Sequence, residues 1–265
     1  MESKQVPSVV GYLDHAYDIS ENREPAFRYL ICSSPRVGST WFADLLTQSH
    51  CAGAPAEYLN PKVLKWGAQS QGPQNFNIWS FLSDVEKRRT SPNGVFGVKV
   101  HLAETLSAIP ERARETFTSR FLAHFDRVIF IKRRDKIYQA ISAYRAFRQQ
   151  TFNVRSEAER EAFKQRAREM PVCPYELTQS LAMVVRQEKA WANALKKNKT
   201  EHTIIYYEDL LGTTLEEMAR IFEYIGVESS LDIFQDSYLI LRDEETDNIY
   251  QNYISFLRQS ESSNM

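Results

Sequence analysis

Short apolar runs alternate along this chain with longer segments in which apolar residues recur with a helical period. The short runs cover residues 29–32, 95–101, 127–131 and 202–207 and predict β-strands. The longer segments predict helices that begin near residue 41 and at about 78–88, 112–124, 136–150, 176–197 and 214–225. Strands that alternate with helices predict an α/β fold, with a central, mainly parallel sheet flanked by helices.

The remaining segments are predominantly polar. Residues 1–27 predict an N-terminal arm on the surface, and residues 28–265 are expected to form a single domain. Residues 61–76 show no periodicity and predict a long loop, whereas residues 156–168 alternate Glu and Arg as in a solvated helix. The C-terminal part is polar, carries an acidic run at residues 243–245 and is expected to fray at its end.

Composition and charge narrow the possible classes of protein. The 265 residues are 43% hydrophobic and 25% charged, as in an ordinary globular protein, and the formal net charge is −1. No global positive field points to nucleic acid, so we expect no nucleic-acid partner. No apolar run reaches membrane-spanning length, the N-terminus lacks a signal pattern, and three cysteines without metal-ligand spacing suit a reducing compartment. We therefore expect a cytoplasmic protein with no transmembrane segment and no metal.

Residues 29–42, with the sequence YLICSSPRVGSTWF, have the clearest chemical character. A strand stops at a short polar loop and a helix follows directly, which is the geometry that presents free backbone N–H groups to an anion. Gly38 permits close backbone approach, and Arg36 adds a planar set of donors for phosphate or sulfonate oxygens. Ser39 and Thr40 add hydroxyl groups at the first helical turn. The stretch predicts a phosphate-binding cradle.

The cradle departs from the best-known phosphate-binding loop, G-x-x-x-x-G-K-[ST]. Ser33 stands where that loop has its first glycine, and Ser39 stands where it has its lysine. The missing lysine argues against hydrolysis of Mg-ATP, and a P-loop-like nucleotide kinase is one alternative function. On this stretch alone, an ordinary strand-to-helix turn with a Ser/Thr cap is an equally good interpretation.

A second group of charges follows the apolar run at residues 127–131. Seven basic residues face a single acid, Asp135, between residues 127 and 148: Arg127, Lys132, Arg133, Arg134, Lys136, Arg145 and Arg148. A solvated helix face would account for the later ones, but Lys132, Arg133 and Arg134 end a buried strand, where charges need partners. Because parallel strands end at one edge of a sheet, this cluster and the cradle are expected to share a ligand. A non-enzymatic anion-binding or nucleic-acid-binding protein is a further alternative.

Five stretches carry a family resemblance: SSPRVGSTWFADLL, AGAPAEYL, PNGVFGVKVH, IKRRDKIYQAISAYRAF and IIYYEDLL. In this order and spacing, from about residue 28 to residue 226, the chain resembles sulfotransferases that use 3′-phosphoadenosine-5′-phosphosulfate (PAPS). It looks most like the bacterial trehalose 2-sulfotransferase type. The resemblance implies a P-loop-like sulfotransferase fold, PAPS as sulfuryl donor and no metal.

The resemblance also assigns residues to the donor. The nucleotide would lie on Ser34, Arg36, Val37, Gly38, Ser39, Thr40, Trp41, Arg133 and Ser142. Arg36 and the first turn of the helix would hold the 5′-phosphosulfate, and Arg133 with Ser142 would hold the 3′-phosphate. Arg134 lies beside Arg133 where the family type has proline, so either arginine is open for this role.

For catalysis, the resemblance assigns the general base to Glu57, while Arg36 would neutralise the leaving phosphate. A carboxylate suits that task if burial raises its pKa toward neutrality. Lys99 is a second candidate for contact with the transferring group, and His101 is a rival base. Ala54 stands where the family type has a glutamate implicated in the sugar acceptor, which leaves trehalose itself open.

The expected reaction is in-line transfer of the sulfuryl group from PAPS to a hydroxyl of a carbohydrate or glycolipid acceptor. The family type suggests a homodimer. The composition of the chain does not identify the acceptor.

Overall fold

A computed structural model of the chain describes residues 13–15, 18–19, 22–72, 74–152, 154, 156–228 and 242–262. Most of the predicted N-terminal arm, residues 1–27, therefore lies outside the described residues.

The centre of the fold is a four-stranded sheet whose strands all run parallel, in the order β2-β1-β3-β4. The strands are β1 (Phe27–Cys32), β2 (Val95–Val100), β3 (Arg127–Lys132) and β4 (Thr203–Tyr206). In the register of the sheet, Ile31 lies opposite Lys99 on one side and Ile129 on the other. Since parallel strands end at the same edge, the residues that follow the four strands meet there. The predicted α/β class with a parallel sheet is confirmed.

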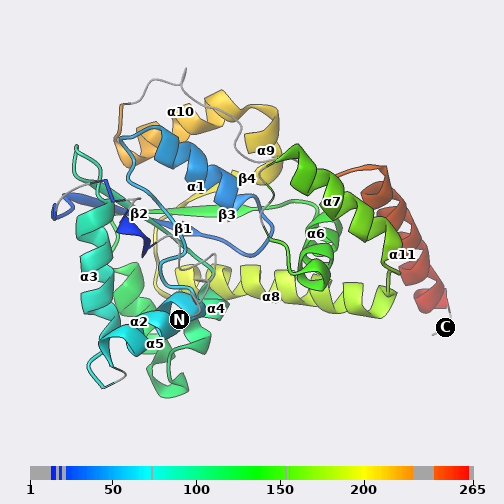
Figure 1. The fold of residues 1–265 in the computed structure, drawn as a ribbon, viewed down its shortest axis with the longest axis horizontal. Coiled ribbons are helices and arrows are strands. Elements are labelled where there is room, and N and C mark those ends of the chain that lie inside the picture. The colour runs from blue at the N-terminus through cyan, green and yellow to red at the C-terminus, as the bar shows by residue number, and fades with distance from the viewer. Residues whose placement is uncertain are drawn as a thin grey trace, which may run out of the picture.

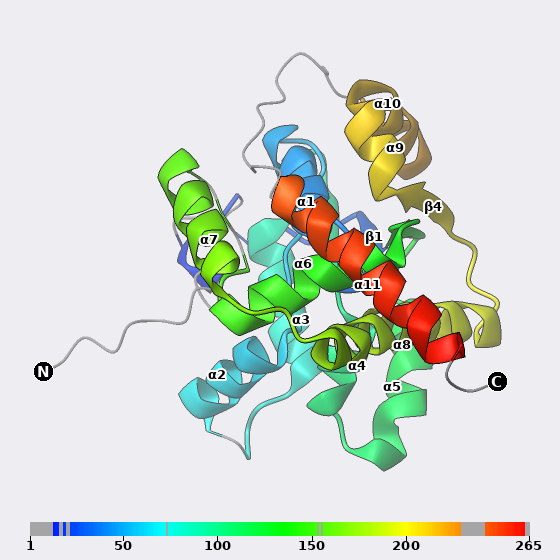
Figure 2. The ribbon, with the colours of Figure 1, turned by 90° about the vertical axis from the view of Figure 1, so that its right-hand side faces the viewer.

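Helices cover both faces of this sheet. Those with defined bounds are α1 (Ser39–Gln48), α2 (Pro61–Gln71), α3 (Ile78–Arg89), α4 (Leu102–Ser107), α5 (Arg114–Leu122), α6 (Lys136–Gln149), α7 (Glu157–Glu169), α8 (Pro174–Lys197), α9 (Tyr207–Gly212), α10 (Thr214–Ile225) and α11 (Glu244–Ser262). Helices α1, α9 and α10 pack on one face, and α2, α3, α5 and α8 pack on the other (Figure 1). Figure 2 shows α11 lying across α6, beside α8.

Alternate residues of β1 and β3 enter different cores. Tyr29 and Ile31 of β1 join the core under α1 and α10, whereas Leu30 and Cys32 join the core over α3, α5 and α8. All four side chains are fully buried. A strand buried on both faces has no polar face, which is why these strands appear in the sequence as continuous apolar runs.

The predicted loop at residues 61–76 is wrong, because residues Pro61–Gln71 form helix α2. Asn60 caps this helix by accepting a hydrogen bond from the Lys62 N–H, and Pro61 occupies the first helical position. Only Val63, Leu64 and Gly67 of α2 are buried, so the helix has too narrow an apolar stripe to show a clear period.

The sequence analysis predicts no helix after residue 225, but residues Glu244–Ser262 form the helix α11. The end of the chain that is expected to fray, residues 263–265, lies outside the described residues. Glu244 and Glu245 of the acidic run fall in the first turn of α11, where negative charge interacts favourably with the helix dipole. Ile249 and Tyr253 are buried against α6 and α8, in a third core. None of the helices in the described residues is long and apolar enough to cross a bilayer.

Gly97 of β2 provides a test of this packing. A Cβ atom at residue 97 would lie 2.3 Å from Cζ of Tyr29, whose hydroxyl group is fixed by donating to the Ala52 carbonyl at 2.7 Å. We predict that Gly97→Ala lowers the free energy of unfolding by about 1–3 kcal/mol in urea titrations, as overpacking does. Gly212→Ala is the matched control, because no atom lies within 4 Å of its added Cβ, and it should change stability little. Equal effects of the two substitutions would contradict this packing.

Candidate active site

The cradle, residues 33–41, connects the end of β1 to the first turn of α1. Arg36 and Gly38 adopt left-handed backbone conformations with φ of 65° and 79°. Gly38 precedes α1 and has no side chain to cap it, so the first N–H groups of the helix have no helical or capping acceptor. The predicted Ser/Thr cap is therefore not observed. A Cβ atom at residue 38 would lie 2.5 Å from Cδ2 of Tyr207, which explains the glycine.

Not every cradle residue offers its side chain to a ligand. Val37 is fully buried in the core under α1, so it can contribute only its backbone. Ser34 is also buried, and its hydroxyl accepts a hydrogen bond from Nε2 of Gln139 at 3.0 Å. Trp41 is partly buried, and its indole N–H has no hydrogen-bond partner among the described residues. The groups that the cradle can offer to a ligand are thus its backbone N–H groups and the partly buried side chains of Arg36 and Thr40.

Arg36 joins the cradle to the second basic cluster. Its Nε donates to the Ser142 hydroxyl on α6 at 3.0 Å, and its Nη1 donates to the Phe152 carbonyl at 2.5 Å. Arg133, directly after β3, donates to the Arg36 carbonyl at 3.4 Å, and its guanidinium lies 4.7 Å from the centre of the Tyr207 ring. The two stretches that the sequence analysis expected to share a ligand are in contact.

The charges of these two arginines are poorly compensated. Within the described part of the chain, neither Arg36 nor Arg133 forms an ion pair, and Nε of Arg133 is buried without a hydrogen-bond partner. Burial and the neighbouring charge of Arg133 lower the pKa of Arg36 to about 10. Burial likewise lowers the pKa of Arg133, although Tyr207 opposes this. An anion between the two guanidinium groups would compensate both charges.

Arg134 faces away from the cradle. Its guanidinium donates to both carboxylate oxygens of Asp209, at 2.5 and 2.7 Å, and half of its side chain is exposed. The Glu208 carboxylate accepts hydrogen bonds from the backbone N–H groups of Arg134 and Asp135 and so joins α9 to the end of β3. Of the two arginines left open by the sequence, Arg133 is the one that reaches the cradle.

Most other members of the basic cluster are neutralised by carboxylates. Five of the seven basic residues between 127 and 148 form ion pairs: Lys132 and Lys136 with Glu188, Arg134 with Asp209, Arg145 with Asp243, and Arg148 with Glu176. These residues hold α6 against α8, α9 and α11 rather than presenting a free basic surface.

A second polar cluster lies beside the cradle, around Glu57. Its carboxylate is 2.8 Å from Nζ of Lys99 and 3.3 Å from Nε2 of His101, and it accepts a hydrogen bond from Nδ2 of Asn60 at 3.0 Å. Nζ of Lys99 also donates to Oγ1 of Thr40 at 2.8 Å. One lysine therefore bridges the predicted base and the cradle. Lys99 lies on β2 beside β1, and the parallel register brings it to the level of the cradle.

The condition set for Glu57 as a base, a pKa raised by burial, is not met in this structure. Burial alone would raise this pKa, but Lys99 and His101 outweigh burial and hold the pKa well below its usual value. For His101, burial favours the neutral ring, yet the Glu57 carboxylate raises the pKa above its usual value. Burial, with the charge of Glu57 as a smaller cause, raises the pKa of Glu104 on α4. Glu57 is thus an ionised carboxylate held between Lys99 and His101.

The sequence analysis missed Gln139, which is fully buried on α6. Its Nε2 donates to the Ser34 hydroxyl at 3.0 Å and to the Pro35 carbonyl at 2.7 Å, so it joins α6 directly to the cradle. The available signal was its spacing, since Gln139 precedes Ser142 by three positions and lies on the same helix face.

Comparison with known proteins identifies the family. The model of the Stf0 sulphotransferase family matches residues 28–253. The chain belongs to the Stf0 sulphotransferase family. It is therefore a sulfotransferase, and the resemblance found in the sequence is confirmed.

Several solved structures are similar to this Stf0 sulphotransferase. A sulfotransferase from Alicyclobacillus acidocaldarius has 12% identity and a TM-score of 0.45, with 88% of this chain and 94% of that chain covered. The sulfotransferase domain from the curacin biosynthetic pathway has 17% identity and a TM-score of 0.44, with 84% and 82% covered. Retinol dehydratase in complex with androsterone and inactive cofactor PAP has 15% identity and a TM-score of 0.40, with 89% and 82% covered. No curated protein matches the sequence.

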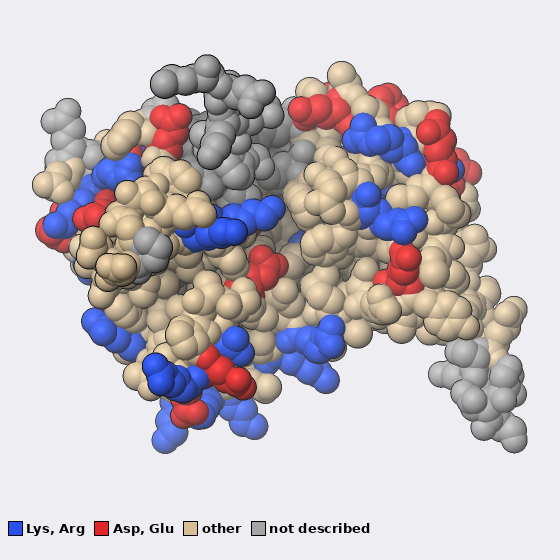
Figure 3. All heavy atoms as spheres, turned by 60° about the horizontal axis from the view of Figure 1, so that its bottom comes forward, with Lys and Arg blue, Asp and Glu red and all other residues tan. Residues whose placement is uncertain are grey.

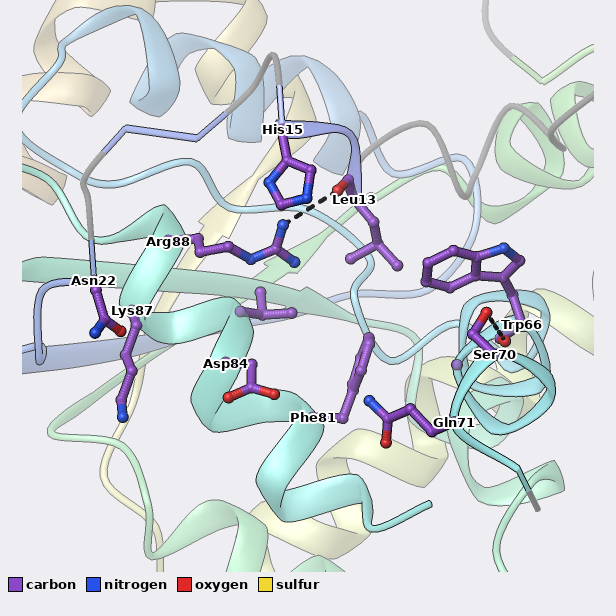
Figure 4. A pocket seen from close by; sticks show the side chains of 12 residues that line it. Leu13, His15, Asn22, Trp66, Ser70, Gln71, Phe81, Asp84, Lys87 and Arg88 are labelled. Carbon is purple, nitrogen blue, oxygen red and sulfur yellow. Dashed lines mark hydrogen bonds between the residues drawn. The ribbon is translucent and has the colours of Figure 1, made fainter. Parts of the chain in front are cut away.

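This Stf0 sulphotransferase also has a hollow away from the cradle. The hollow, of about 400 Å³, lies between α2 and α3, and Leu13, Trp66 and Phe81 face it (Figure 4). None of the predicted site residues lines it. Among the residues that the structure describes, no group of His, Cys, Asp and Glu side chains could hold a metal ion.

The raised pKa of His101 predicts a pH dependence of stability. The stabilisation that His101 gains from Glu57 is complete below its ordinary pKa of 6.5 and is lost as the pH rises through the raised pKa of the folded protein. The free energy of unfolding of the wild type, measured in urea from about pH 6 to about pH 9, should therefore fall more steeply than that of His101→Gln. The difference in slope is at most about 1.4 kcal/mol per pH unit. Parallel curves for the two proteins would contradict the ion pair.

Proposed function

We propose that this sulfotransferase moves the sulfuryl group of PAPS to a hydroxyl of a carbohydrate or glycolipid acceptor by in-line transfer. The observation that carries the proposal is the position of Lys99, whose Nζ lies 2.8 Å from both Thr40 Oγ1 in the cradle and the Glu57 carboxylate. The Lys99 ammonium group thereby contacts both the proposed phosphate-binding cradle and the carboxylate proposed as the base.

The residues present suit a donor with two anionic groups. The free N–H groups of α1 and Arg36 form one set of donors for the 5′-phosphosulfate, as a helix start does for phosphates. Arg133 and the Ser142 hydroxyl form a second set for the 3′-phosphate, and Nε of Arg133 is a donor without a hydrogen-bond partner among the described residues. Arg36 contacts Ser142 and so lies between the two sets.

PAPS supplies the sulfuryl group, and the chain supplies position and charge. Arg36 and the cradle N–H groups stabilise the negative charge that develops on the leaving phosphate. Lys99 stabilises the negative oxygens of the group in transfer. A new anion beside Lys99 competes with Glu57 for its charge, which raises the pKa of Glu57 and equips it to accept the proton of the acceptor hydroxyl. His101 holds Glu57 from the other side.

The alternatives fit less well. A nucleotide kinase of the P-loop type uses a lysine at the position of Ser39. A nucleic-acid binder needs a continuous basic surface, but five of the seven clustered basic residues are paired with carboxylates. On the face shown in Figure 3, Lys and Arg side chains are interspersed with Asp and Glu.

The proposal extends to the setting of the enzyme. We propose a single domain from residue 28 onward and a homodimer, which size-exclusion chromatography with light scattering would test. A cytoplasmic location agrees with the three cysteines Cys32, Cys51 and Cys173, all of which are free thiols.

Substitution of Glu57 tests the base. We predict that Glu57→Gln lowers turnover about 10²- to 10⁴-fold while leaving the affinity for adenosine 3′,5′-bisphosphate (PAP) unchanged. Turnover is measured as transfer of labelled sulfate from PAPS to trehalose and to octyl β-D-glucoside, and affinity by calorimetry. Glu104→Gln, a nearby carboxylate outside the cradle contacts, is the control and should retain most activity. A fully active Glu57→Gln enzyme would remove Glu57 from the mechanism.

Gln139 tests the donor site. We predict that Gln139→Leu weakens PAP binding about 5- to 30-fold, because two hydrogen bonds that hold Ser34 and Pro35 are lost. Gln149→Leu is the matched control on the same helix, since Gln149 bonds to the Phe163 carbonyl and not to the cradle. Similar PAP affinity in both variants would argue against a donor site in the cradle.

A further inference from the structure

Two phenylalanine rings lie exposed together after helix α6. Phe147 in the last turn of α6 is 41% exposed, and Phe152 in the following loop is 40% exposed. Their ring centroids are 5.4 Å apart and their planes meet at 77°, an edge-to-face pair. Single exposed apolar side chains are ordinary on protein surfaces, whereas a contacting aromatic pair forms a small continuous apolar patch.

The backbone holds this pair in a defined position. Gln150 adopts a left-handed conformation with φ of 52°, which is unfavourable for a residue with a side chain. The N–H of Gln150 bonds to the Phe147 carbonyl, and the N–H of Thr151 bonds to the Ala146 carbonyl, which together end the helix in a Schellman motif. Val154, beyond the pair, is buried. The unfavourable conformation of Gln150 therefore belongs to the turn that places Phe152 against Phe147.

The same loop contacts the cradle. The Phe152 carbonyl accepts the hydrogen bond from Nη1 of Arg36 at 2.5 Å, so the backbone that carries one ring of the patch contacts the guanidinium proposed to bind the donor. Arg36 also donates to Ser142, which lies five residues before Phe147 on α6. An apolar patch thus adjoins a cationic anion-binding site, with no intervening element between them at Phe152.

We propose that the acceptor carries an apolar arm, an alkyl or acyl chain, which covers the Phe147–Phe152 pair while its hydroxyl group enters the transfer site. This inference rests on the proposed function and narrows its acceptor to an amphiphilic glycoside of the glycolipid kind. A free disaccharide would leave both rings in water and gain nothing from them, whereas each buried methylene group contributes about fourfold in affinity.

The alkyl glucosides with methyl, butyl and octyl chains test the proposal, because they share one sugar and differ only in the length of the apolar arm. Each is titrated below its critical micelle concentration into the full-length protein saturated with PAP, and the dissociation constant is measured by calorimetry. We expect octyl β-D-glucoside to bind at least about tenfold more tightly than the methyl compound. In Phe147→Ala/Phe152→Ala this gain should largely disappear.

Controls distinguish binding at the Phe147–Phe152 pair from non-specific hydrophobic binding and from a failure of the donor site. Leu215→Ala, which removes a 53% exposed leucine on α10, should retain the full dependence on chain length. The single variants Phe147→Leu and Phe152→Leu serve if the double variant does not fold, and each should lose part of the gain. Equal affinity for all three glucosides, or the same gain in the phenylalanine variants, would overturn the apolar arm. Failure of the wild type to bind PAP would instead overturn the proposed function, and the glucosides would then be titrated without PAP.

Discussion

The structure depends on one geometric constraint, the parallel direction of its four strands. Because all four strands end at one edge, four different segments begin there: the cradle, His101, Arg133 and Tyr207. Each segment is short and would have little affinity for an anion alone. Their juxtaposition brings Arg36, Arg133 and Lys99 to one edge of the sheet, beside the start of α1.

The charges of the molecule are distributed unevenly around this edge. The chain has a net charge of −1, and most basic residues near α6 are paired with carboxylates from α8, from α9 and from Asp243, the residue before α11. Arg36 and Arg133 are different, since they are partly buried beside each other and form no ion pair among the described residues. Lys99 differs from both groups, because it forms an ion pair but its partner, Glu57, is the residue proposed as the general base. The candidate site is thus the place where the positive charges of Arg36 and Arg133 have no carboxylate partner among the described residues.

Local signals made much of this predictable from the sequence. Apolar runs identify β1, β2 and β3 because these strands are buried on both faces. The cradle is recognisable because strand, loop and helix start are contiguous. Helices α2 and α11 are not apparent from the apolar period, because each buries only a few apolar side chains; Asn60-Pro61 and the acidic residues at the start of α11 are the helix-start signals in the sequence. The contact of Lys99 with Thr40 and Glu57 depends on strand register and loop path, which no local pattern contains. The direction of the Glu57 pKa shift was unpredictable for the same reason.

Helix α8 supports the donor edge from behind. Glu188 binds Lys132 and Lys136 at the end of β3, and Trp191, one turn later, donates from its indole N–H to the Ser33 and Val100 carbonyls at the ends of β1 and β2. The ends of β1, β2 and β3 are thus all held by side chains of the single helix α8. The loop that bears Phe152 meets this edge differently, through the hydrogen bond that its carbonyl accepts from Arg36. A substitution that shifts α8 would therefore displace the ends of β1, β2 and β3 together, so the shape of the edge depends on a helix that is distant from it in the sequence.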